Sequence, residues 1–228
     1  MKKCALVCLL VFSCLAVAFG EQDWDALLAK AKAGDADAQA EVGRSYAIGK
    51  GVTRDLGEAV KWDQKSADQG NANGEYGLAS AYEAGYGVPR DVPKAIKLFE
   101  ASAKQGKVEA MLHLARMYDD GRGIAKDQAM AAKYYLEAAE KGRPDAQLRL
   151  GMMYESGQGV KQDYGEAMKY YQKAAEKNSG MAEYKIGYFY ENGYGVPKDK
   201  SKAKEWYKKS GDHGNPDAAE QIQNLDKQ

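Results

Sequence analysis

The sequence predicts an all-α protein, an α-solenoid of five 36-residue helix-turn-helix repeats with a capping helix at each end. Three observations predict it: a tyrosine recurs every 36 residues, a pair of glycines follows each tyrosine, and an aspartate follows each glycine pair. The tyrosines are Tyr46, Tyr82, Tyr118, Tyr154 and Tyr190. Five registers in phase without one insertion are typical of a repeat array.

Residues 1–20 precede the repeats and are expected to form a secretory signal peptide. A basic start, an apolar run and the small-x-small pattern Ala18-Phe19-Gly20 favour cleavage before Glu21. The mature chain, 21–228, is then periplasmic or secreted. Two alternatives stay open: lipid anchoring at Cys14, and an uncleaved apolar anchor.

Composition narrows the function classes. All cysteines (Cys4, Cys8 and Cys14) lie in the leader, so the mature chain has no thiol for disulfides, metal binding or catalysis. Without Lys2 and Lys3, 31 basic residues face 33 acidic ones. A near-neutral chain gives no argument for a nucleic-acid partner. No later segment is apolar enough for an integral membrane span.

An N-terminal capping helix is expected in 21–34, where Ala31 matches Ala67 in the second-helix register. The first helix of repeat one is expected from Ala36 to Ile48, because Ala38, Val42 and Tyr46 form one helical stripe. A small residue recurs within this helix, which predicts close packing of two helices. These small residues are Gly43, Ala79, Ala115, Gly151 and Gly187.

The second helix of each repeat is expected to begin after an aspartate that caps its free amides. The aspartates are Asp55, Asp91, Asp127, Asp163 and Asp199. Glu58 and Glu166 have the spacing of a capping box. Ala59, Trp62 and Ala67 are predicted to be buried. Asn178 stands where other repeats have a closing glycine, and it can adopt the same left-handed backbone.

These patterns assign the repeats to residues 35–70, 71–106, 107–142, 143–178 and 179–214. Pro144 and Pro216 lie in the first turn of the helices that follow them. Residues 215–228 are expected to form the C-terminal capping helix, because they keep the first-helix register but carry polar residues.

The repeat resembles the Sel-one-like repeat, a relative of the tetratricopeptide repeat. The resemblance is clearest at residues 146–160, AQLRLGMMYESGQGV, and continues through Asp163, Ala167 and Tyr170. It covers 35–214 and implies a right-handed α-solenoid whose first helices line a concave surface. Some bacterial relatives carry disulfides and are linked to penicillin binding. Because the mature chain lacks cysteine, that activity is not carried over.

Catalytic and metal sites are not predicted. His113 and His213 lie in different repeats, and neither has a second ligand at metal-binding spacing. His213 is interpreted as a surface residue near a helix end, and Asp119-Asp120 as a solvated acidic turn. The glycine pairs follow helices rather than strands, so they are turns and not phosphate-binding loops. The chain is therefore expected not to be an enzyme and to need no cofactor.

Function in a solenoid is expected at positions that differ between repeats. On the first helices, one face holds positions 37, 41, 44 and 48 and their equivalents, and we call it the variable face. The predicted partner-binding residues on it are Arg44, His113, Arg116, Arg149, Met152, Lys185 and Tyr188. Arginine, methionine and tyrosine are enriched where proteins bind proteins. Reversing Arg116, Arg149 and Lys185 to Glu is expected to abolish partner binding without unfolding.

The resulting hypothesis is an exported scaffold that binds a protein partner on the concave face. A finer form is an immunity protein that neutralises a toxic effector, because some exported relatives protect bacteria against antagonistic enzymes, including phospholipases. The alternatives are an envelope assembly adaptor, anchored by lipid at Cys14, and a hydrolase of the penicillin-binding type. The hydrolase is disfavoured because no nucleophile–base pair is visible.

Overall fold

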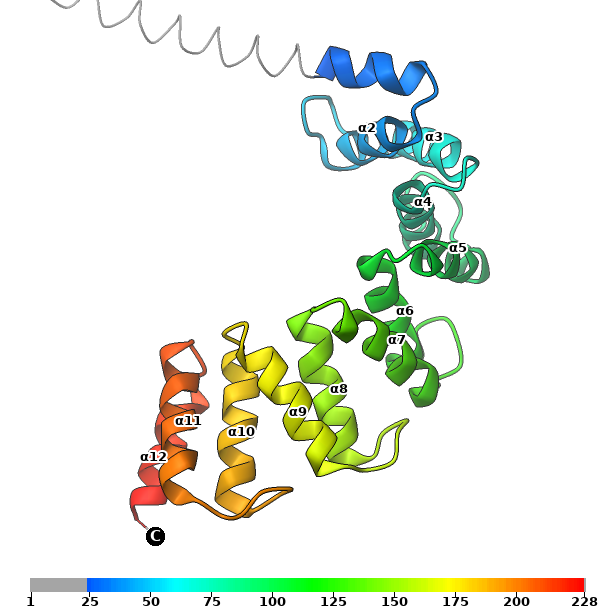
Figure 1. Cartoon of the computed structure of the whole chain (residues 1–228). Coiled ribbons are helices and arrows are strands. Elements are labelled where there is room, and N and C mark those ends of the chain that lie inside the picture. Colours follow the sequence, from blue (N-terminus) through cyan, green and yellow to red (C-terminus); the bar gives the residue numbers. More distant parts are fainter. Residues whose placement is uncertain (1–23, 228) are drawn as a thin grey trace, which may run out of the picture. The chain divides into compact units, whose positions relative to one another are not determined.

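The computed structural model describes residues 24–227 as helices joined by short loops, and these residues contain no strand (Figure 1). The expected signal peptide, Cys14 included, lies outside the described residues. A helix over 24–32 comes first. It is followed by α2 (Ala36–Ile48), α3 (Leu56–Ala67), α4 (Ala72–Ala84), α5 (Val92–Lys104), α6 (Val108–Asp120), α7 (Gln128–Glu140), α8 (Pro144–Ser156), α9 (Tyr164–Ala175), α10 (Gly180–Asn192), α11 (Lys200–Asp212) and α12 (Asp217–Asp226). The predicted all-α solenoid is confirmed.

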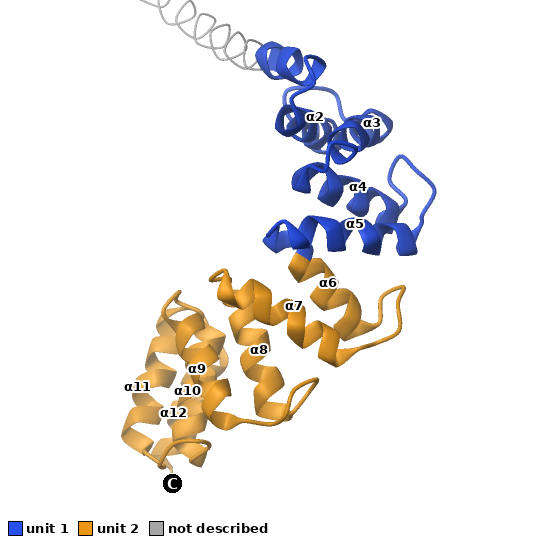
Figure 2. Ribbon diagram, turned by 45° about the vertical axis from the view of Figure 1, so that its right-hand side comes forward, with its two compact units in different colours: residues 1–110 blue, residues 111–228 orange. Residues whose placement is uncertain are grey.

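The helices group into two units, one ending at Ala110 and the other beginning at Met111 (Figure 2). Within unit 1, α2 packs on α3 and α4 packs on α5; α4 also contacts α2 and α3. Within unit 2, α8 packs on α7 and α9, α10 on α9 and α11, and α12 on α11. No helix in the described part is long and apolar enough to cross a membrane.

The five predicted aspartates all cap second helices. Each carboxylate accepts from backbone amides in the first turn, as Asp55 does from Glu58 N at 3.0 Å. The capping box is wrong, because the Asp55 N–H already donates to Tyr46 O at 3.0 Å. Glu58 instead forms an ion pair with Lys61 at 2.6 Å. Glu166 likewise pairs with Lys169.

In later repeats the second glycine of the pair also permits a close contact with the preceding repeat, whereas a Cβ on Gly51 of the first repeat would meet no atom within 4 Å. Gly159 has φ +70°, and a Cβ placed on it would lie 2.0 Å from Gln128 O at the start of α7. A Cβ on Gly87 would lie 2.3 Å from Leu56 O at the start of α3. The turn of one repeat therefore touches the helix start of the preceding repeat, which only glycine permits. Asn178 adopts φ +59°, as predicted.

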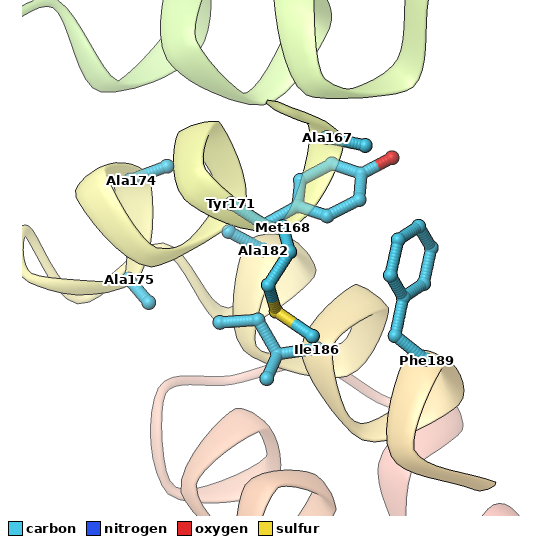
Figure 3. Close-up of a cluster of buried hydrophobic side chains, with 8 residues drawn as sticks. All are labelled: Ala167, Met168, Tyr171, Ala174, Ala175, Ala182, Ile186 and Phe189. Carbon is cyan, nitrogen blue, oxygen red and sulfur yellow. The ribbon is translucent and has the colours of Figure 1, made fainter. Parts of the chain in front are cut away.

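The core of unit 2 shows how the repeats pack. Met168 and Tyr171 of α9 meet Ile186 and Phe189 of α10 (Figure 3), and the rings of Tyr171 and Phe189 lie edge to face at 5.5 Å. A Cβ on Gly151 would lie 2.6 Å from the Tyr171 ring. The small residue within the first helix thus makes room for the aromatic side chain of the second helix, as the pattern predicted.

Within a repeat, the two helices are joined by a hydrogen bond at a separation of 30 residues. Ser66 Oγ donates to Ala36 O at 2.7 Å, and Ser102 Oγ donates to Ala72 O at the same distance. In unit 2, Ser210 Oγ donates to Gly180 O at 2.6 Å. Each bond joins the end of the second helix to the start of the first helix of the same repeat.

Candidate functional site

A groove of about 380 Å³ lies on the variable face in unit 2. It brings together four of the seven predicted partner-binding residues, two from α8 and two from α10. They are Arg149, Met152, Lys185 and Tyr188. The other lining residues include Glu155, Tyr164 and Tyr194.

Tyrosine rings form much of the groove surface. Tyr164 stacks on Tyr194 with ring centroids 5.0 Å apart, and Tyr188 meets the same ring at 5.7 Å. Burial is the main cause that raises the pKa of Tyr188, so its hydroxyl stays neutral at physiological pH. Met152 is half-buried beside these rings. The groove therefore offers aromatic and thioether surface with neutral hydroxyls, which suits contact with a protein.

Arg149 of the groove is held in an ion pair. Its guanidinium donates from two nitrogens to Asp119 Oδ2, at 2.9 and 2.5 Å. The Asp119 side chain is only 6% exposed, so the prediction of a solvated Asp119 is wrong. Its neighbour Asp120 is exposed and pairs with Arg122, as an acidic turn would. The sequence could not show the pairing, because Asp119 and Arg149 belong to successive repeats.

Lys185 is held in the same way, one repeat further along. Its ammonium donates to both Glu155 oxygens at 3.0–3.1 Å. The Tyr171 hydroxyl also donates to Glu155. Burial, reinforced by this bond, raises the pKa of Tyr171 far above its ordinary value. Tyrosine, acid and lysine form a closed triad beneath the groove.

These pairs correct the expected result of the triple charge reversal. Glutamate at 149 would face the buried carboxylate of Asp119, and glutamate at 185 would face Glu155. Removing one partner of a buried pair leaves the other charge uncompensated. The reversal is therefore expected to destabilise unit 2, so it is unsuitable as a test of binding. Arg149 and Lys185 each join their own repeat to the preceding one.

The remaining predicted residues lie outside this groove. Arg116 is exposed and within 3.6 Å of Asp145. His113 lies on α6 and is half-buried. Arg44 lies in unit 1, 72% exposed, with Glu41 at 3.8 Å. His213 is exposed at the C-terminal end of α11, as predicted, and its Nδ1 lies 2.8 Å from a carboxylate oxygen of the buried Glu183.

A second hollow, of about 490 Å³, lies on the variable face in unit 1. It is lined by α2 and α4, with Arg44 at its rim and Asp63 of α3 inside. Sequence analysis missed Asp63, which is 6% exposed, and predicted burial instead for Ala67, which is half-buried. The signal was present, because the equivalent residue in the other repeats is aromatic. Those residues are Phe99, Tyr135, Tyr171 and Tyr207.

Asp63 has no hydrogen-bond or ion-pair partner among residues 24–227. Burial raises the pKa of its carboxyl from 3.8 to about 7. The carboxylate lies between two glycines: Cβ atoms on Gly43 and Gly77 would come within 2.3 and 2.6 Å of its oxygens. The pocket therefore contains an unpaired acid that titrates near neutral pH.

The described residues contain no group of three or more His, Cys, Asp or Glu side chains that could hold a metal ion. Further hollows of about 590 and 470 Å³ lie along second helices, beside Trp206 and Trp62 respectively. Neither is formed by the variable face.

The sequence matches the Sel1 repeat over residues 36–71, 72–107, 108–142, 144–179 and 180–215. Among solved structures it is similar to a protective antigen of uropathogenic Escherichia coli strains that displays an SLR fold, with 36% identity and a TM-score of 0.81. The match covers 86% of this chain but only 42% of the antigen. A Sel1 repeat protein from Oxalobacter formigenes is 33% identical, with a TM-score of 0.70, over 82% of this chain and 76% of that one. No curated protein sequence matches the chain.

Proposed function

The chain belongs to the Sel1 repeat family, whose repeats form scaffolds for protein interactions, and from that premise we propose that it is an exported, non-enzymatic protein that binds a protein partner on its variable face. One observation carries the proposal. In both units, first helices line a hollow with residues that differ from repeat to repeat. Repeat proteins commonly bind partners through such residues on a constant frame.

The hollows of the two units offer different chemistry. Unit 1 presents a buried acid, whereas unit 2 presents tyrosine rings, a methionine and paired charges. A protein partner can satisfy either kind of site, because its surface carries both cationic and apolar groups. The finer proposal is that the partner is a toxic effector that this protein neutralises. A periplasmic or secreted location, after removal of residues 1–20, fits that role.

The test uses residues 21–228 immobilised and exposed to envelope extract, with bound proteins identified by mass spectrometry. The informative variant combines Arg44→Glu and Arg116→Glu, because both side chains are at least half exposed and their nearest acids are exposed too. Its matched control combines Lys97→Glu and Lys208→Glu, the same charge change at exposed second-helix positions.

The expected result is one dominant protein that the wild type and the control retain and the variable-face variant releases. A captured enzyme whose activity falls on binding would support the immunity role, and a structural envelope protein would support an assembly adaptor. Equal retention by all three proteins would contradict binding on this face.

A further inference from the structure

The unit 1 pocket reaches Asp63 because three side chains that pair with one another beneath the unit 2 groove are replaced together. The unit 2 residues are Tyr171, Glu155 and Lys185, and three repeats earlier the same positions hold Asp63, Ala47 and Gly77. The aromatic ring is thus replaced by a short acid, the acid by a methyl group, and the cation by a hydrogen atom. The volume of two long side chains and most of a ring is thereby left open to solvent.

The last repeat shows that the closed arrangement is not an isolated case. Tyr207 Oη donates to Glu191 Oε2 at 2.6 Å, and Gln221 Nε2 donates to the same oxygen at 2.9 Å. In both closed triads the acid receives a hydroxyl and a nitrogen donor. Asp63 receives neither donor, although it is only 6% exposed. An unpaired buried carboxylate is costly, which makes a missing donor the notable feature of this pocket.

Cations of the pocket do not supply that donor. Lys107 pairs with Glu109 at 3.2 Å, and Arg44 lies closest to Glu41 at 3.8 Å. Asp37 accepts from Asn71 at 2.7 Å. Four acidic side chains line the pocket against two basic ones, so its field favours a positive charge.

We propose that the unit 1 pocket binds an organic cation, a primary ammonium or guanidinium group on an aliphatic stem, with Asp63 as its counter-ion. The ammonium supplies the donors that Asp63 lacks, and the stem packs on Ala40, Ala47 and the Tyr76 ring. A cavity of about 490 Å³ has the size of a small-ligand site. The pocket opens on the variable face, so the inference rests on the proposed function where it names a lysine or arginine of the partner as the occupant.

The test measures binding of small cations to residues 21–228 and the titration of Asp63 by carboxyl-carbon NMR. The probes are cadaverine, agmatine and lysine blocked at both backbone ends, with 1-pentanol and hexanoate as neutral and anionic counterparts. The cations are expected to bind with a Kd on the order of 1 mM and to lower the pKa of Asp63 by about one unit or more. Pentanol and hexanoate are expected to do neither.

Two variants test the counter-ion: one removes its charge and the other displaces it. Asp63→Asn keeps the shape of the side chain, and Gly77→Ala pushes a methyl group against the carboxylate. Each is expected to weaken cation binding at least about tenfold. Asp68→Asn is the matched control, because it removes an exposed acid of the same region and is expected to bind as the wild type does.

The outcomes separate the sources of the cation. Binding of blocked lysine points to a side chain of a protein partner, whereas binding of cadaverine alone points to a free diamine. If no cation binds at tens of millimolar, or if Asp63→Asn binds as the wild type does, the inference is overturned. Partner capture by the immobilised protein is scored separately, so the proposed function can survive that failure.

Discussion

The two units fill the equivalent space between adjacent helices with different side chains. In unit 2, Tyr171 of the second helix extends to Glu155 of the adjacent first helix, and Lys185 of the next repeat completes the contact. In unit 1, Asp63 takes the place of the ring and meets no donor. The same arrangement of helices therefore contains a hydrogen-bonded triad of side chains in unit 2 and an open, acidic pocket in unit 1. A repeat can lose its aromatic anchor and keep its helices, provided neighbouring positions are small.

The largest effect is expected when unit 2 is converted to the unit 1 arrangement. Tyr171→Asp removes a fully buried ring and leaves Glu155 beside a second acid. The free energy of unfolding is expected to fall by about 4 kcal/mol, the range for truncating a buried aromatic residue. Urea denaturation followed by circular dichroism measures it. A loss below about 1 kcal/mol would mean that the triad does not hold unit 2 together.

The ion pair beneath the groove provides the next test. Arg149→Glu is expected to lower the free energy of unfolding by about 3 kcal/mol. The buried Asp119 would lose the Arg149 guanidinium and gain a like charge beside it. Arg116→Glu, at an exposed pair on the same face, is expected to cost below about 1 kcal/mol. Similar losses in the two variants would show that the Arg149 pair is no more important than a surface pair.

The open pocket is expected to make stability depend on pH. The pKa of Asp63 is raised on folding from 3.8 to about 7, so the folded state keeps a proton that the unfolded chain loses. The contribution of this residue is therefore most favourable below pH 4 and declines until about pH 7, by up to about 4 kcal/mol. Asp63→Asn is expected to remove this decline and to raise stability at pH 8 by about 2 kcal/mol. Thermal unfolding of both proteins from pH 4 to 8 tests this; parallel curves would show that Asp63 does not titrate in that range.

The smallest effect is expected from removing a capping aspartate, and it is expected to be equal in the two units. Asp55 and Asp163 cap equivalent helices with the same 3.0 Å bond. Replacing either by Ala is expected to cost about 1 kcal/mol. Equal losses of unfolding free energy, measured by urea denaturation, would show that helix capping is the same in both units. The units would then differ only at the triad and the pocket. A cost confined to one unit would mean that the capping bonds are not equivalent.

The frame could be predicted from sequence because each of its features is local. An aspartate caps the helix that follows it, a glycine ends the helix before it, and the stripe of Ala38, Val42 and Tyr46 lies within one helix. The bonds between repeats were missed because they join residues about one repeat apart that no local pattern connects. Arg149 and Asp119 illustrate this, since each looks like a solvated charge in its own helix.

The pocket was missed for a different reason. Comparison of repeats identified variable positions on the first helices, but position 63 lies on the second helix, which was treated as frame. An acid among four aromatic residues at that position is visible in the sequence. Its burial without a donor is not, because that depends on Ala47 and Gly77 of two different helices.

The spacing of 30 residues between bonded partners has a consequence for folding kinetics. Bonds such as Ser66 to Ala36 and Ser210 to Gly180 close loops of the same moderate length, wherever they lie in the chain. Native contacts of this kind give a low relative contact order, which is associated with fast folding. Nucleation can therefore begin in any repeat, and each further pair of helices has a similar loop-closure entropy.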